Sequence, residues 1–170
     1  SVDTGRSLTA SNMLAGSGTL TKTGNGTLTT MGNGISNSMS VVVSAGTWAA
    51  GNGQIAFLTV DGGIVSSGGT VTATSYYLKS GEVQAKLGTG SIFVTGGTTK
   101  VGSSFNSASN AVSIQSGTLL LGNNNRIGTN ASVNISGGTL DMSTFTNTIG
   151  SLVMSSGAVS GTGANKLTAT

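Results

Sequence analysis

The chain contains no cysteine, no histidine and no proline among its 170 residues. The lack of cysteine excludes disulfides and thiolate metal sites. The lack of histidine excludes histidine acid–base catalysis and histidine metal ligation. Long apolar runs are also missing: none approaches the about 18 residues that a membrane-spanning helix needs. We therefore expect no membrane insertion of this segment.

Charge is scarce as well, because charged residues make up only 6% of the chain. The basic residues are Arg6, Lys22, Lys79, Lys86, Lys100, Arg126 and Lys166. They form no cluster that could follow a phosphate backbone, so we expect no nucleic-acid partner. The acids are only Asp3, Asp61, Glu82 and Asp141. They do not converge as the carboxylate groups of a polysaccharide-cleaving enzyme or a calcium site. We expect no catalytic residues, no metal and no cofactor.

The sequence repeats a ten-residue pattern that is centred on a glycine. It occurs seven times between Ser40 and Ser160, at Gly46, Gly63, Gly81, Gly97, Gly117, Gly138 and Gly157. The mean spacing is about 18.5 residues. A fixed period in this range is typical of a solenoid, in which each repeat buries its apolar face against its neighbours.

Two apolar columns precede the glycine in every copy. The residues five before it are Val41, Leu58, Tyr76, Ile92, Val112, Val133 and Leu152. The residues three before it are Val43, Val60, Leu78, Val94, Ile114, Ile135 and Met154. A polar residue always follows the second column, and this strict alternation predicts a strand with one buried face.

After the glycine the apolar pattern resumes. Two residues past it stand Trp48, Val65, Val83, Leu119, Leu140 and Val159, with Thr99 as the exception in the fourth copy. The glycine and the small residue before it predict a sharp bend, since glycine takes positive φ at little steric cost. The rest of each turn predicts a looser third side, with inward contacts from Ile55, Val71, Phe105, Ile127 and Phe145. We interpret Trp48 as a core residue.

The predicted fold class is all-β: a parallel β-helix, or β-solenoid, with about 18–20 residues per turn. We expect the commoner right-handed form. The chain is interpreted as a single β-helix segment, 1–170, with N-terminal turns over 1–39 and seven regular turns over 40–170. Stacked at about 4.8 Å per turn, these would make a rod about 40 Å long.

Two aromatic residues stand out in the column that faces solvent. Tyr77 and Phe93 lie four residues before successive glycines, so their rings should stack side by side on the outer face. Adjoining exposed aromatics indicate a partner-binding surface, for a host surface or a glycan. The alternatives are a covering loop, a neighbouring protomer or simple cross-strand pairing. Asp61 should meet Lys79 of the next turn in a surface ion pair.

Two stretches resemble a known family. Residues 16–34 read GSGTLTKTGNGTLTTMGNG, with paired Gly-Thr-Leu units eight residues apart. They resemble the passenger-associated transport repeat of bacterial autotransporters. Residues 136–152, SGGTLDMSTFTNTIGSL, are similar to a phrase of the same passenger domains. The resemblance implies a secreted β-helical stalk displayed on the bacterial cell surface.

The chain opens at Ser1 without a signal peptide, and neither terminus has the pattern of a capping helix. We interpret it either as the middle of a longer passenger or as a subunit whose ends pair with other copies. The predicted function is a non-catalytic extracellular scaffold of a surface-displayed, adhesin-type passenger. The alternative is a secreted structural fibre subunit that assembles end to end.

Overall fold

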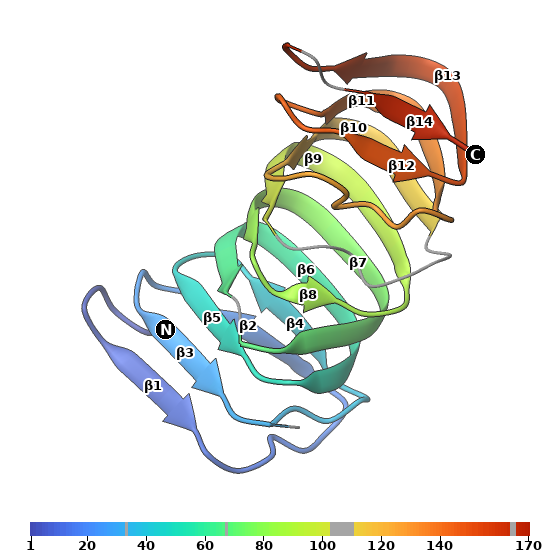
Figure 1. Cartoon of the computed structure of the whole chain (residues 1–170). Coiled ribbons are helices and arrows are strands. Elements are labelled where there is room, and N and C mark those ends of the chain that lie inside the picture. Colours follow the sequence, from blue (N-terminus) through green and yellow to red (C-terminus); the bar gives the residue numbers. More distant parts are fainter. Residues whose placement is uncertain (33, 67, 103–110, 164–165) are drawn as a thin grey trace.

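The computed structural model describes residues 1–32, 34–66, 68–102, 111–163 and 166–170. Within these residues the chain contains no helix, and its strands stack in parallel as a β-solenoid of about 8 turns. Figure 1 shows the turns following one another from the N-terminal strands to β13 and β14 at the other end. The predicted fold class is confirmed.

The N-terminal turns consist of short strands separated by bends. They are β1 (Ser7–Ala10), β2 (Thr19–Lys22), β3 (Thr27–Thr30), β4 (Ser40–Val43) and β5 (Thr47–Ala50). The first strand of each turn stacks on the first strand of the next, so β2 pairs with β4. The second strands stack likewise, in the order β1, β3, β5.

From β6 (Gly53–Ser66) onwards the two strands of a turn merge through the bend into one longer strand. The later ones are β7 (Thr70–Val83), β9 (Ser91–Val101), β10 (Ala111–Leu121), β11 (Ser132–Asp141) and β13 (Ser151–Ser160). The third side contributes β8 (Lys86–Leu87), which pairs with β7, and β12 (Asn147–Ile149), which pairs with β14 (Leu167–Ala169). Among the described residues, the twelve strands other than β12 and β14 form one sheet that winds around the core.

Both predicted apolar columns are continuous ladders in the structure. The first column pairs in order from Val41 to Leu152, and the second from Val43 to Met154, without a break. Every member is buried except the two in β13, where Leu152 is half-buried and Met154 is exposed. Like residues stacked in parallel therefore build a core that runs along the axis.

The predicted register is wrong between β7 and β9 after their bends, although from β9 to β10 it holds again, since Leu119 pairs with Thr99. Aligning the glycines places Thr99 on Val83, but the structure pairs Val83 with Val101 and Gly81 with Thr99. The bend of β9 is two residues longer than that of β7, which shifts the pairing between Leu78 and Gly81. Thr99 still points inward and is fully buried, and its hydroxyl has no hydrogen-bond partner within the described part of the chain.

The bend glycines are needed for two different reasons. Gly81 has the expected positive φ of 110°, which side chains rarely adopt. Gly138 does not have a positive φ, so the prediction is wrong there, as it is for Gly63. A Cβ on Gly138 would instead lie 2.6 Å from Ile114 Cγ2 and 2.7 Å from Gly117 O, so close stacking of turns excludes a side chain.

On the third side Ile55, Val71 and Ile127 are buried as expected, and Phe145 is half-buried. The predicted contact of Phe105 lies outside the described residues. Trp48 is a core residue, as predicted: it is 3% exposed. Its indole nitrogen donates to a hydroxyl oxygen one turn away, that of Thr30, at 3.1 Å.

Tyr76 anchors the corner between the third side and the first strand. It is fully buried, and its hydroxyl accepts a hydrogen bond from the Ala73 N–H at 2.9 Å. The same hydroxyl lies 2.9 Å from the Val71 carbonyl oxygen and 3.2 Å from that of Thr89. Burial raises the pKa of Tyr76 to about 12, against a smaller opposing effect of the backbone hydrogen bonds.

Candidate functional site

The structure brings the two predicted site residues together. Tyr77 and Phe93 are direct partners in the ladder between β7 and β9. Their ring centroids are 5.5 Å apart, and the ring planes are nearly parallel, at 17°. A third ring, Phe57 on β6, lies 6.3 Å from Tyr77 and is tilted by 52°. We call these three residues the aromatic ladder.

Sequence reasoning missed Phe57, although a signal was present. Phe57 lies two residues before Thr59, which pairs with Tyr77, so it is a diagonal neighbour across the strands. Diagonal neighbours are within reach when the side chains are aromatic. Phe57 is 42% exposed, whereas Tyr77 and Phe93 are half-buried.

The ring geometry decides which surfaces of the aromatic ladder are free. A near-parallel pair with centroids 5.5 Å apart is stacked with an offset, so Tyr77 and Phe93 each cover part of one face of the other. Phe57 approaches Tyr77 from its other neighbouring turn. The ladder is therefore a ridge of rings that stand upright on the sheet. Such a ridge suits insertion into a partner's apolar groove better than flat stacking under a ligand.

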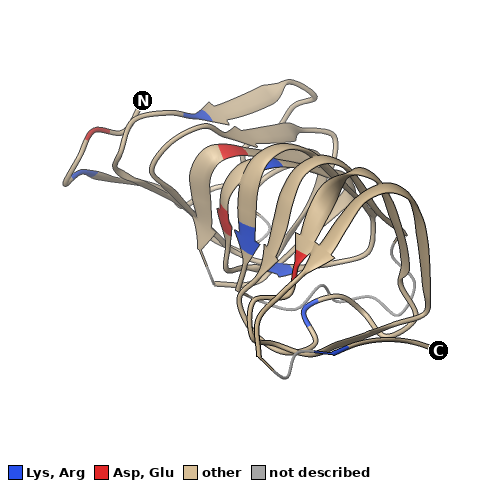
Figure 2. Cartoon of the chain, turned by 90° about the horizontal axis from the view of Figure 1, so that it is seen from above, with Lys and Arg blue, Asp and Glu red and all other residues tan. Residues whose placement is uncertain are grey.

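Two ion pairs join successive turns of the coil. The Lys79 ammonium is 3.5 Å from an Asp61 carboxylate oxygen, which confirms the predicted pair. Lys100 lies 3.3 Å from Glu82 and was not predicted, because it depends on the shifted register. Asp61 and Glu82 thus each have a lysine of the next turn as partner, and the charges are dispersed along the coil (Figure 2). Exposed pairs of this kind contribute about 0–1 kcal/mol each.

Lys22 is buried, although charged side chains ordinarily lie at the surface. Its side chain is only 2% exposed. The ammonium donates hydrogen bonds to the carbonyl oxygens of Thr23 at 2.9 Å, Gly24 at 2.6 Å and Ala45 at 3.1 Å. Burial lowers the pKa of Lys22 from its usual value. Lys22 pairs with Val43, so extending the repeat by one turn would have placed it inward.

A cavity of about 230 Å³ adjoins Lys22 at the N-terminal turns. Its remaining lining is mostly apolar and comes from Val2, Leu8, Ala10, Leu14, Leu20 and Leu28, with Ser1, Thr21 and Thr23. Leu8 is 56% exposed beside it. The ammonium is fully engaged by carbonyl oxygens, so Lys22 acts as an internal brace of the bend.

A shallow groove follows the corner where the third side meets the first strand, and we call it the axial groove. Its larger part, about 570 Å³, is lined by Asn37, Gln54, Ile55, Thr72, Ala73, Thr74, Thr89 and Gly90. A smaller part of about 340 Å³ shares Asn37 and Gln54 and adds Met13, Ile35 and Ser36. The lining residues come from successive turns, so the groove runs along the coil. No sequence signal pointed to it.

In the described ranges, no three acidic side chains gather into a group that could hold a metal ion. None of the described segments forms a helix long and apolar enough to cross a membrane. Comparisons with protein-family models, with curated proteins and with solved structures give no match for this chain.

Proposed function

We propose that this chain is a non-catalytic, extracellular scaffold: a rigid segment of an adhesin-type passenger displayed on a bacterial cell surface. The observation that carries the proposal is the unbroken stacking of both apolar columns, from Val41 to Leu152 and from Val43 to Met154. A core continuous along the axis makes the turns one stiff unit, which is what a stalk requires.

The resemblance to autotransporter passengers supports the same role. Its first stretch forms one turn of the coil, with the two Gly-Thr-Leu units on either side of a bend. Leu20 packs half-buried against the core, and Leu28 is 6% exposed. The repeat thus consists of residues that a β-solenoid turn uses. This supports a secreted β-helical passenger as the source of the motif.

The scaffold role is tested by the shape and rigidity of the purified chain. Small-angle X-ray scattering across a concentration series should give a single rod of about 40 Å at every concentration. A compact or flexible particle would contradict a rigid stalk. Cell-surface display of the chain should extend an epitope placed at its far end away from the membrane.

The aromatic ladder is the proposed contact with a host surface. Tyr77→Ala combined with Phe93→Ala should weaken adhesion of displaying cells, since it removes the ridge from the outer face. Stability should change little, because both rings are half-buried. Unchanged adhesion and unchanged self-association would assign the ladder to cross-strand pairing alone.

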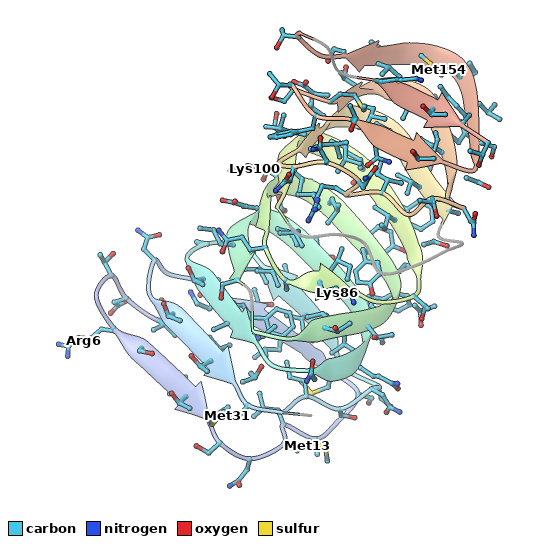
Figure 3. The ribbon with its side chains drawn as sticks, in the orientation of Figure 1. Arg6, Met13, Met31, Lys86, Lys100 and Met154 are labelled. Carbon is cyan, nitrogen blue, oxygen red and sulfur yellow. The ribbon has the colours of Figure 1, made fainter. Side chains whose placement is uncertain are left out.

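Fibre assembly is the second candidate, favoured by apolar exposure in the end turns. In β13, Met154 is 44% and Val159 is 37% exposed, and at the opposite end Leu8 is 56% exposed (Figure 3 labels Met154). Strand edges beside exposed apolar side chains recruit further strands. Electron microscopy at increasing concentration should then show fibres that Met154→Lys with Val159→Lys abolishes. Single rods at every concentration would remove this candidate.

A further inference from the structure

We propose that the axial groove binds a linear, uncharged oligosaccharide that lies parallel to the coil axis. This goes beyond the scaffold role, since it depends on the lining of the groove and not on where the coil is displayed. The groove is also separate from the aromatic ladder, which lies three residues further along the same strands, as Gln54 and Phe57 show on β6.

The lining has the chemistry of a site for sugar hydroxyls. Asn37 and Gln54 each offer an amide that both donates and accepts hydrogen bonds. Thr72, Thr74 and Thr89 add hydroxyls with the same dual capacity. None of the described lining residues of either part of the groove is charged. Neutral polar groups of this kind match a ligand rich in hydroxyls and without charge.

The apolar surface that the groove offers to a sugar ring lies at its smaller part, where the Met13 side chain is 61% exposed. Ile55 and Ala73 also border the groove, but each is only 4% exposed and packs in the core. A Cβ on Gly90 would clash with the Ala73 carbonyl oxygen of the neighbouring turn and would lie 3.0 Å from the buried Tyr76 ring, so close stacking of the turns requires glycine there. Sites for small molecules combine such apolar surface with a few polar groups that fix orientation.

The spacing of the polar groups follows the coil. Asn37, Gln54, Thr72 and Thr89 belong to successive turns, and turns stack at about 4.8 Å. A β-1,4-linked sugar chain repeats at a similar interval. One ring per turn can therefore meet an amide or a hydroxyl at each level, which favours a linear ligand along the axis.

Other classes of ligand fit the groove less well. An extended peptide would need a free strand edge, but Gly53–Ile55 pair with Val71–Ala73, and Thr70 and Val71 pair with β8. An anionic polymer would need basic side chains in the lining. Lys86 lies nearby on β8 but does not line the groove (Figure 3). A neutral saccharide is the class that remains.

The test is a titration of the ¹⁵N-labelled 170-residue chain, followed by NMR. The probes are cellohexaose, xylohexaose, β-1,4-mannohexaose and maltohexaose, with hexagalacturonate as the anionic comparison. At least one neutral hexasaccharide should shift the amide signals of Gln54, Thr72 and Thr89. Gln54→Ala combined with Thr72→Ala should weaken that binding roughly tenfold, because two hydrogen-bonding groups are lost.

A matched control is Thr98→Ala combined with Gln115→Ala, which changes the same residue types at exposed positions elsewhere on the coil. This variant should bind as the wild type does. The proposal is overturned if no neutral hexasaccharide, at concentrations up to about 10 mM, shifts the signals of the groove residues. Any affinity that escaped detection at that concentration would be too weak to count as specific binding. The proposal is also overturned if only hexagalacturonate binds, or if the control loses as much affinity. X-ray scattering of the wild type and both double variants tests the rod shape separately. A groove that binds no saccharide would therefore leave the scaffold role intact.

Discussion

Replacing Tyr76 with phenylalanine tests whether the interior of the coil is built as described. The ring is fully buried, so the substitution keeps the packing and removes only the hydroxyl. The Ala73 N–H then loses its acceptor, whereas the Val71 carbonyl oxygen keeps the hydrogen bond that it accepts from the Gly88 N–H at 2.7 Å. A buried polar group left without a partner costs about 1–3 kcal/mol. We expect Tyr76→Phe to lower the free energy of unfolding by about 1–3 kcal/mol at neutral pH.

The pH dependence provides a sharper test. Burial raises the pKa of Tyr76 to about 12, whereas a tyrosine in the unfolded chain ionises near 10. Between these values the native state keeps a proton that the unfolded state releases, so the free energy of unfolding falls as pH rises. The loss reaches about 2–3 kcal/mol near pH 12. Tyr76→Phe has no such group, so the advantage of the wild type should shrink steadily above about pH 10.

The assay is urea unfolding of wild type and variant, followed by circular dichroism, from about pH 8 to pH 11.5. Tyr77→Phe is the matched control, because it makes the same change at the adjacent, half-buried residue on the outer face. The control should differ from wild type by less than about 0.5 kcal/mol. A wild-type advantage over Tyr76→Phe that stays constant across this pH range would refute a buried, hydrogen-bonded hydroxyl.

Three further changes test other parts of the coil by urea unfolding. Lys22→Met should destabilise the chain by about 1–2 kcal/mol, because three carbonyl oxygens lose their donor, whereas Lys79→Met should change little; an equally stable Lys22→Met would contradict the brace. Thr99→Val should stabilise the chain by about 1 kcal/mol, since it removes a buried hydroxyl without a partner, and a loss of stability would show that this hydroxyl is bonded. Leu78→Asp and Ile114→Asp should each prevent folding, because each puts a charge into a fully buried ladder, and a soluble folded variant would overturn the register.

Much of the candidate site could be predicted from the repeat. Tyr77 and Phe93 occupy the same column in successive turns, so their contact follows from the period alone. Phe57 was missed because it belongs to the neighbouring column and reaches Tyr77 diagonally. The axial groove could not be predicted, since its polar lining residues form no motif in the sequence. They come together only when successive turns stack.

The sequence by itself determined the fold class, the two inward columns and the outward one. The physical reason is that strand alternation and a repeat of about 18 residues leave one way to bury the apolar side chains. Tertiary structure alone decided where the ladder shifts by two residues at Thr99. It also decided that Lys22 turns inward to three carbonyl oxygens. The shift depends on the length of one bend, and the contacts of Lys22 depend on which backbone groups meet across turns. A repeat period that is common to all turns contains no information about either.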